Sequence, residues 1–365
     1  MTLKNVQLVP LGGYLAGLFL VVFFLAIFST GTFAQVWIDE ENVGSKYTNE
    51  NAVTNATVNY GGRLSNQSGG SITNATVHDG SFTNLSGTIF NVTVSGNRSN
   101  SPGEFYNYEE GLITNATVNT GGLFRNYGTI DHLTVDGGIL ENYVAGTIAN
   151  VTMKDGTLYN DGWIHEMTYL GGQYDAIYGG GTGIIDILTI AGRLEVSNPN
   201  LWGTIGLLQF ADNGSGVLFF TGYLPDNSAS VAGLTPNNIS FTNINAQVVD
   251  LAFGGIVLDL SNVGTFEQDW DSFLISVLGD TFSLQSLFGM AEVTGTKSLN
   301  FIDIYWNSQS FRLLDKGDLA KGWNYSGSQL EFAYGKTIVP EPATLLILGL
   351  GLAGAGLATR RKMRN

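Results

Sequence analysis

The chain has 365 residues, no cysteine, three histidines and a formal net charge of −15, and its 12% aromatic content favours a packed core over disorder. The lack of cysteine excludes disulfide scaffolds, cysteine-ligated metal centres and thiol nucleophiles. The acidic excess argues against nucleic-acid binding, which needs clustered lysine and arginine to displace counterions from phosphates.

The first predicted element is a secretion signal over residues 1–34. Lys4 precedes a long apolar run, and Thr32 and Ala34 are the small residues that a signal peptidase needs at its −3 and −1 subsites. We therefore expect cleavage after Ala34, with Gln35 as the first residue of the exported chain. An uncleaved membrane anchor is the alternative interpretation.

Residues 50–195 are dominated by an internal repeat. A motif of the form Asn-Ala-Thr-Val recurs at intervals of 16 to 24 residues, and its central threonines are Thr57, Thr76, Thr93, Thr117, Thr134, Thr152, Thr168 and Thr189. A second motif alternates with it, an apolar residue followed two positions later by an asparagine: Asn66, Asn84, Asn107, Asn126, Asn142 and Asn160. A unit of about 18 residues is too small to bury its own core, so the repeats must stack.

The predicted fold is therefore an all-β parallel β-solenoid. Alternation along a strand places the Ala or Val and the last Val of the first motif inward and the Thr outward. In the second motif the apolar residue and the Asn share the inward direction, so we expect a corner ladder of stacked amides. Eight turns at about 4.8 Å each make a rod of about 38 Å. Residues 96–102 are expected to leave the stack as a loop.

The repeat is similar to the glycine-rich repeats of autotransporter-type adhesin passengers. The similarity covers about residues 50–195 and implies an extracellular, adhesin-like role. It adds to the fold prediction from the repeat and identifies no ligand.

Residues 196–336 are predicted to be a β-rich continuation that then caps the solenoid. The expected strands are 217–220, 248–253, 256–260, 299–305 and 330–334. The amphipathic stretch 269–279 predicts a short helix. A cap is expected because an open solenoid end is an exposed sheet edge.

The segment 339–365 has three ordered parts. Pro340-Glu341-Pro342 comes first, an apolar stretch over 345–358 follows, and a basic cluster ends it with Arg360, Arg361, Lys362 and Arg364. The apolar stretch would make a helix of about 21–24 Å, short for a ~30 Å hydrocarbon core. The basic cluster is expected to stay in the cytoplasm.

This arrangement resembles the PEP-CTERM sorting signal of Gram-negative bacteria that produce exopolysaccharide. The resemblance implies recognition and cleavage by an exosortase after transient anchoring in the inner membrane. An ordinary C-terminal membrane helix is the alternative. Without residues 1–34 and the segment after Pro342, the chain holds 31 acidic and 11 basic residues, a net charge of −20, which favours solubility and leaves cation bridging open.

Candidate sites for chemistry are sparse. Asp79, Asp136 and Asp155 each precede a glycine and could stack into a calcium-binding column, but the turn geometry that Asp-Gly satisfies is the interpretation we favour. His78 and His132 do not align, because His78 follows its threonine strand and His132 occupies the asparagine position of its own. Several aromatic residues lie near the second and third motifs and could stack on sugars, although side-on packing over the turns is the interpretation we favour: Tyr106, Tyr108, Tyr127, Tyr143, Tyr159 and Trp163.

The sequence thus predicts an exported, non-enzymatic structural or adhesive protein of the cell surface or exopolysaccharide matrix, with no cofactor. Its expected partners are signal peptidase, an exosortase, extracellular polysaccharide and, transiently, the membrane. The main alternative is a polysaccharide lyase or hydrolase on the same scaffold. A less favoured alternative is an ice-binding solenoid that uses the threonine column.

Overall fold

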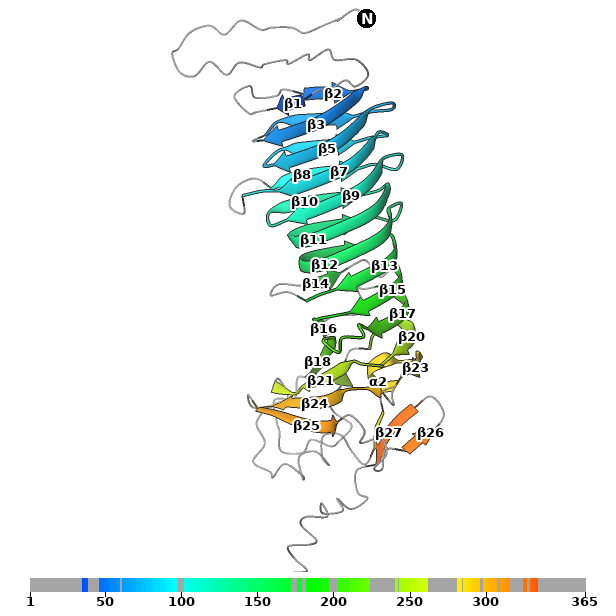
Figure 1. Cartoon of the computed structure of the whole chain (residues 1–365). Coiled ribbons are helices and arrows are strands. Elements are labelled where there is room, and N and C mark those ends of the chain that lie inside the picture. Colours follow the sequence, from blue (N-terminus) through cyan, green and yellow to red (C-terminus); the bar gives the residue numbers. More distant parts are fainter. Residues whose placement is uncertain are drawn as a thin grey trace, which may run out of the picture.

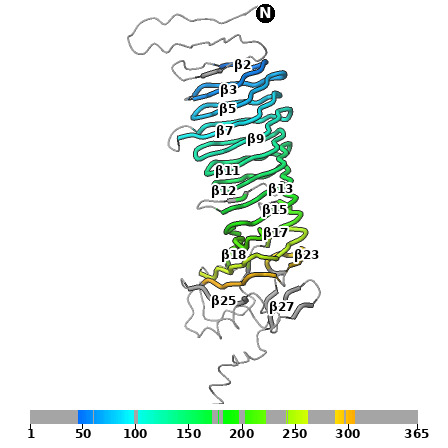
Figure 2. Tube along the Cα trace, in the orientation of Figure 1, coloured from blue at the N-terminus to red at the C-terminus, as the bar shows by residue number. Residues whose placement is uncertain are grey.

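In the computed structural model the chain winds into a long stack of turns, each built of short β-strands, that runs from the N-terminal to the C-terminal part of the chain (Figure 1). The structure describes residues 35–38, 46–59, 61–97, 102–171, 176–178, 182–196, 203–223, 240–241, 243–261, 281–283, 285–295, 298–306, 309–315, 324–326 and 329–333. Successive turns of the chain lie directly over one another along the axis, as the tube view shows (Figure 2). The fold is an all-β parallel β-solenoid in which about eight turns carry the sequence repeat.

One side of the stack is a series of strands, each paired in parallel with the next, and the eight from β3 to β15 carry the first motif. These strands are β1 (Gln35–Ile38), β3 (Ala52–Asn59), β5 (Ser71–His78), β7 (Thr88–Ser95), β9 (Leu112–Asn119), β11 (Thr129–Asn142), β12 (Thr147–Asn160), β13 (Trp163–Tyr169), β15 (Ile184–Ile190), β17 (Thr204–Phe210), β20 (Ala246–Asp250) and β23 (Glu292–Thr294). Both β11 and β12 continue around a corner into the second side.

The second side holds the strands with the second motif, again in parallel. They are β2 (Lys46–Asn49), β4 (Arg63–Asn66), β6 (Ser81–Asn84), β8 (Gly103–Asn107), β10 (Gly122–Asn126), the latter halves of β11 and β12, and β14 (Ala176–Tyr178). A further parallel series follows with β16 (Arg193–Val196), β18 (Val217–Tyr223), β21 (Gly255–Asp259) and β24 (Phe301–Trp306).

The repeat threonines pair in register from turn to turn. Thr57 is the partner of Thr76, which pairs with Thr93, and the series runs unbroken to Thr189. The 24-residue interval between Thr93 and Thr117 leaves this register intact. Its extra residues are therefore accommodated between β7 and β8, although residues 98–101 of the expected loop lie outside the described residues.

The core is a set of apolar columns, one residue per turn in each. Ala56 and Val58 of the first motif are buried, as alternation predicts, and so is Leu64 of the second. Below Leu64 the same column holds three phenylalanines, Phe82, Phe105 and Phe124, whose rings stack with centroids 4.8 and 4.7 Å apart. Burial of each such side chain stabilises the fold by about 1.5–3 kcal/mol.

The second motif builds the predicted asparagine ladder inside the corner. Its members are fully or almost fully buried, and each Nδ2 donates to the Oδ1 of the next turn at 2.8–2.9 Å. The ladder consists of Asn49, Asn66, Asn84, Asn107, Asn126, Asn142 and Asn160. Asn49, which the repeat analysis omitted, extends it by one turn because Tyr47-Thr48-Asn49 is a further copy of the second motif.

A left-handed residue makes the other corner, where the chain leaves the first side. Gly61, Gly121 and Gly137 have φ of 79°, 74° and 89° there. Asp79 has φ of 58° and lies directly below Gly61, whose N–H donates to the Asp79 carbonyl at 2.8 Å. Aspartate is one of the few residues with a side chain that tolerates this conformation.

The parallel order of strands extends beyond residue 195, through β17, β20 and β23 on one side and β18, β21 and β24 on the other. The remaining elements are β19 (Ser240–Phe241), β22 (Thr281–Ser283), α2 (Gln285–Phe288), β25 (Gln309–Asp315), β26 (Asn324–Ser326) and β27 (Gln329–Ala333). The pairings of β19, β22, β25, β26 and β27 are antiparallel. The predicted helix over 269–279 lies outside the described residues, and the one-turn α2 was not predicted.

Candidate functional site

Two columns of polar side chains point outward from the first side of the solenoid. We define the Asn–Thr face as the outward asparagines and threonines of β3, β5, β7 and β9: Asn55, Asn74, Asn91, Asn115, Thr57, Thr76, Thr93 and Thr117. The asparagines pair in register with one another, as the threonines do. All eight side chains are exposed or half-exposed, whereas the residues between and after them are buried.

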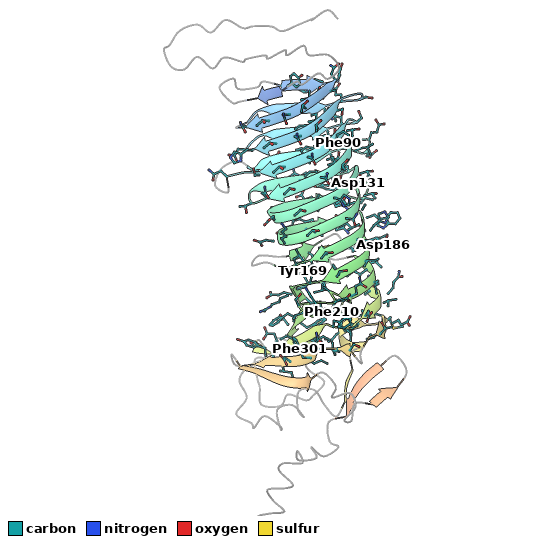
Figure 3. All side chains as sticks on the ribbon, in the orientation of Figure 1. Phe90, Asp131, Tyr169, Asp186, Phe210 and Phe301 are labelled. Atoms are coloured by element: carbon teal, nitrogen blue, oxygen red, sulfur yellow. The ribbon has the colours of Figure 1, made fainter. Side chains whose placement is uncertain are left out.

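A change of parity within each strand brings the asparagines to the surface. In β7, Ile89 and Val92 are buried while Phe90 and Asn91 between them are both exposed. The same pattern recurs in β5. Two successive outward residues mean that the strand bends at this point, and the bend forms an edge of the solenoid. Figure 3 shows Phe90, Asp131 and Asp186 projecting along this edge.

The amides of the Asn–Thr face are held in place by one another. Asn74 Nδ2 donates to Asn55 Oδ1, Asn91 Nδ2 to Asn74 Oδ1, and Asn115 Nδ2 to Asn91 Oδ1, each at 3.0 Å. These asparagines form a second ladder, which lies on the solvent-facing surface of the sheet rather than in the core. Asn91 Nδ2 also donates to the Thr73 carbonyl at 3.4 Å. Each amide oxygen keeps at least one lone pair that no described protein group uses.

The threonine hydroxyls of the Asn–Thr face have no hydrogen-bond partner among the described protein groups. Farther along the same column Thr189 differs, because its Oγ1 accepts a hydrogen bond from Gln209 at 3.1 Å. Each turn from β3 to β9 thus presents one ordered amide and one hydroxyl able to donate and accept.

The same columns change character from β11 onward. His132 takes the asparagine position in β11, and Glu166 takes it in β13. Asp136 and Lys154 follow the threonines of β11 and β12, and their side chains are 3.5 Å apart. The polar face is therefore uncharged in its first four turns and charged in the turns that follow.

A second candidate surface lies at the turn after the buried asparagine ladder. We define the tyrosine edge as Tyr108, Tyr127 and Tyr143, which occupy successive turns. Their rings stack nearly parallel, with centroids 5.6 and 4.3 Å apart. Because each ring covers the face of the next, this edge presents ring rims and hydroxyls to solvent rather than open ring faces.

Arg125 lies on the neighbouring strand surface and is connected to the tyrosine edge through Glu141, which also accepts from Tyr143. Its Nε donates to Glu141 Oε2 at 2.7 Å, its Nη1 to the hydroxyl of Tyr106, and its guanidinium lies 5.0 Å from the Tyr106 ring centre. Nη1 also lies 3.9 Å from Glu104 Oε1. Tyr106, Arg125 and Glu141 share one outward column with the exposed Tyr159.

These contacts shift three pKa values. Burial and the hydrogen bond to Glu141 raise the pKa of Tyr143 to about 12. Burial and the hydrogen bond to Glu104 raise the pKa of Tyr106. Partial burial lowers the pKa of Arg125, but the hydrogen bond and charge of Glu141 raise it more, so that the net shift is upward. The network is thus held neutral at its phenols and charged at its arginine.

The three aspartates considered for calcium do not lie in one column. Asp136 and Asp155 are register partners on adjacent turns. Asp79 lies three turns away, fills the left-handed corner position and accepts a hydrogen bond from the backbone N–H of Asn97. Within the described residues no three acidic or histidine side chains gather as a metal site.

One polar cluster was not anticipated from the sequence. Asp186 Oδ2 accepts from Trp163 Nε1 at 2.9 Å and lies 2.9 Å from His165 Nδ1. The indole and imidazole rings are 4.5 Å apart. The residues come from adjacent turns, so only the register of β13 and β15 reveals their contact.

The sorting and cleavage residues lie outside the described residues: Thr32, Ala34, Pro340, Glu341, Pro342, Arg360, Arg361, Lys362 and Arg364. Gln35, where cleavage was predicted to leave the new N-terminus, is the first residue of β1. Among helices in the described ranges, none is long and apolar enough to cross a bilayer.

Comparison with family models gives a match over residues 339–362, described as the PEP-CTERM protein-sorting motif. The chain carries a PEP-CTERM sorting motif. Its residues are those singled out above: the Pro-Glu-Pro segment, the apolar stretch and the basic cluster as far as Lys362. The PEP-CTERM motif indicates an exported protein that is sorted to the cell surface and processed by an exosortase. No curated protein matches the chain.

Proposed function

We propose that the protein is a non-enzymatic structural or adhesive component of the cell surface or exopolysaccharide matrix of a Gram-negative bacterium. In this proposal signal peptidase removes residues 1–34, the segment after Pro342 anchors the chain briefly in the inner membrane, and an exosortase releases it. The solenoid then acts as a stiff rod outside the cell.

The observation that supports this proposal most strongly is the register of the outward side chains. Each column of the Asn–Thr face repeats the same chemical group once per turn along the axis. A repeating surface suits a repeating ligand, such as a polysaccharide, because each further turn adds an equivalent contact. The stacked amides and apolar columns inside the rod keep that spacing fixed.

The test is to incubate the full-length chain, in mild detergent, with the exopolysaccharide of its own host. Co-sedimentation of protein with the polymer measures binding, and size-exclusion chromatography of the polymer measures its chain length. We expect binding with unchanged chain length. Shortening of the polymer would instead support the lyase or hydrolase alternative, and absence of both effects would contradict the proposed role.

A further inference from the structure

We propose that the Asn–Thr face binds an uncharged polysaccharide chain that lies along the solenoid axis. The inference rests on the proposed function and adds a ligand class and a set of residues to it. Three properties of the face carry it: its lack of charge, the order of its polar groups and its repeat along the axis.

The Asn–Thr face is neutral in an otherwise acidic protein. None of the strands β3, β5, β7 and β9 contains Asp, Glu, Lys or Arg. On this side of the solenoid, charged residues follow in β11, with Asp131 and Asp136. A face without cations has no means to hold an acidic polymer, and the net charge of −20 expected for the exported chain repels one. Hydrogen bonding to an uncharged, hydroxyl-rich ligand is the interaction that this face can supply.

The polar groups of the face are ordered before any ligand arrives. The exposed amide ladder fixes Asn55, Asn74, Asn91 and Asn115 through bonds of 3.0 Å. The neighbouring threonines are β-branched, which restricts their rotamers. Binding therefore costs little side-chain entropy, which is the usual cost of a polar interface. The amides and hydroxyls both donate and accept, as sugar hydroxyls do.

The arrangement also sets the direction of the ligand. The amide–hydroxyl pair recurs at each turn, about 4.8 Å along the axis, the separation of adjacent β-strands. A chain lying along the axis crosses successive strands and meets the same pair at each step, whereas a chain lying parallel to one strand meets the pair only once. Binding should therefore strengthen with the length of the polysaccharide.

The tyrosine edge is a weaker candidate for the same ligand. Sugar stacking needs an open aromatic face, and the rings of Tyr108, Tyr127 and Tyr143 cover one another. The polar groups beside them are engaged with each other, since Tyr143 donates to Glu141 and Arg125 donates to both Tyr106 and Glu141.

A triple substitution tests the proposal: Thr76→Val, Thr93→Val and Thr117→Val. Valine keeps the shape and β-branching of threonine and removes only the hydroxyl. The matched control is Thr134→Val, Thr152→Val and Thr168→Val, which makes the same change in the same column where the turns carry charges. Melting of both variants by circular dichroism shows whether each remains folded as the wild type does.

The probes are a β-1,3-glucan, a β-1,4-glucan and dextran as neutral polymers, and alginate as an acidic one, each applied to the full-length chain in mild detergent. We expect wild-type protein to bind at least one neutral polymer, with an affinity that is insensitive to ionic strength. The Asn–Thr triple variant should bind about tenfold or more weakly, because three hydrogen bonds are lost. The control variant should bind as the wild type does.

Equal binding by the two triple variants, binding of alginate alone, or no binding of any neutral polymer would overturn the proposal. If the wild type still bound host exopolysaccharide in any of these cases, the proposed function would stand and only this assignment would fall. Inhibition of ice recrystallisation without binding to a neutral polymer would likewise overturn it, in favour of ordered water as the ligand.

Discussion

The two asparagine ladders offer a comparison between the same interaction in the core and at the surface. Asn107 is buried, donates from Nδ2 to Asn126 Oδ1 at 2.9 Å and to the Gly111 carbonyl at 3.2 Å, and accepts from Asn84 at 2.9 Å. Asn91 is exposed and makes bonds of the same kind: it donates to Asn74 at 3.0 Å and accepts from Asn115 at 3.0 Å. Each side chain thus connects the turn before it to the turn after it.

We predict that Asn107→Ala lowers the free energy of unfolding by about 3 kcal/mol. Three hydrogen bonds of 2.9–3.2 Å are lost at about 1 kcal/mol each, and the 3.5 Å contact of Nδ2 with the Thr129 carbonyl adds little. The partners keep a second bond, from Asn84 to the Gly87 carbonyl and from the Gly128 N–H to Asn126, so the full cost of an orphaned polar group is not added. Asn91→Ala should cost no more than about 0.5 kcal/mol, because water replaces the lost partners.

Urea unfolding followed by far-ultraviolet circular dichroism measures both variants, with the slope of the transition checked against the wild type. Hydrogen exchange at the Gly128 N–H reports whether the loss is local to the ladder. Equal costs for the two substitutions, or a cost below about 1 kcal/mol for Asn107→Ala, would show that burial does not decide the strength of these bonds.

Three further outcomes are expected. Gly111→Ala should destabilise the fold by about 2 kcal/mol or more, because a Cβ there would lie 2.3 Å from Asn107 Oδ1 and 2.7 Å from Asn84 Nδ2. The same urea transition measures this cost, and an unchanged midpoint of the transition would contradict the packing of this turn. Tyr143 has a pKa of about 12 in the folded state and about 10 when unfolded, so its contribution to stability is complete below about pH 10 and is lost as pH rises toward 12. Tyr143→Phe should therefore reduce the fall in the free energy of unfolding between about pH 10 and 12. The same pH dependence of that free energy in variant and wild type would refute the assignment. Replacing Pro340, Glu341 and Pro342 by alanine should leave the uncleaved chain in the membrane fraction of its host, as mass spectrometry would show, and normal release would exclude the PEP-CTERM motif as the sorting determinant.

The turn-to-turn register and the buried ladder were predictable from the sequence because a strand alternates its side chains strictly. Once the threonines were aligned, the parity of Phe105 and Asn107 followed. Asn49 carried the same signal in Tyr47-Thr48-Asn49, but its turn lacks a well-formed first motif ahead of it. The placement of Asp79 was also recoverable, since aligning Gly80 with Gly62 puts Asp79 one turn after the left-handed Gly61, at the same corner position.

Other features depend on geometry that periodicity does not contain. The bend at Phe90 and Asn91 violates simple alternation, so the exposed amide ladder was not foreseen as a ladder. The stacking of the tyrosine edge depends on side-chain rotamers across turns, and the contact of Asp186 with Trp163 and His165 joins residues more than 20 positions apart. Neither follows from spacing alone.

The corner between β7 and β8 carries a broader consequence. It takes up the longest interval in the repeat, 24 residues from Thr93 to Thr117, and yet the turns on either side pair as if nothing had been added. The length of the rod, the residues on its surface and the loops inserted at its corners are therefore separable properties of this molecule. Duplicating a turn would lengthen the rod, and substituting outward residues would change its surface chemistry. Inserting residues at this corner would enlarge a loop. Each change would leave the other two properties as they are.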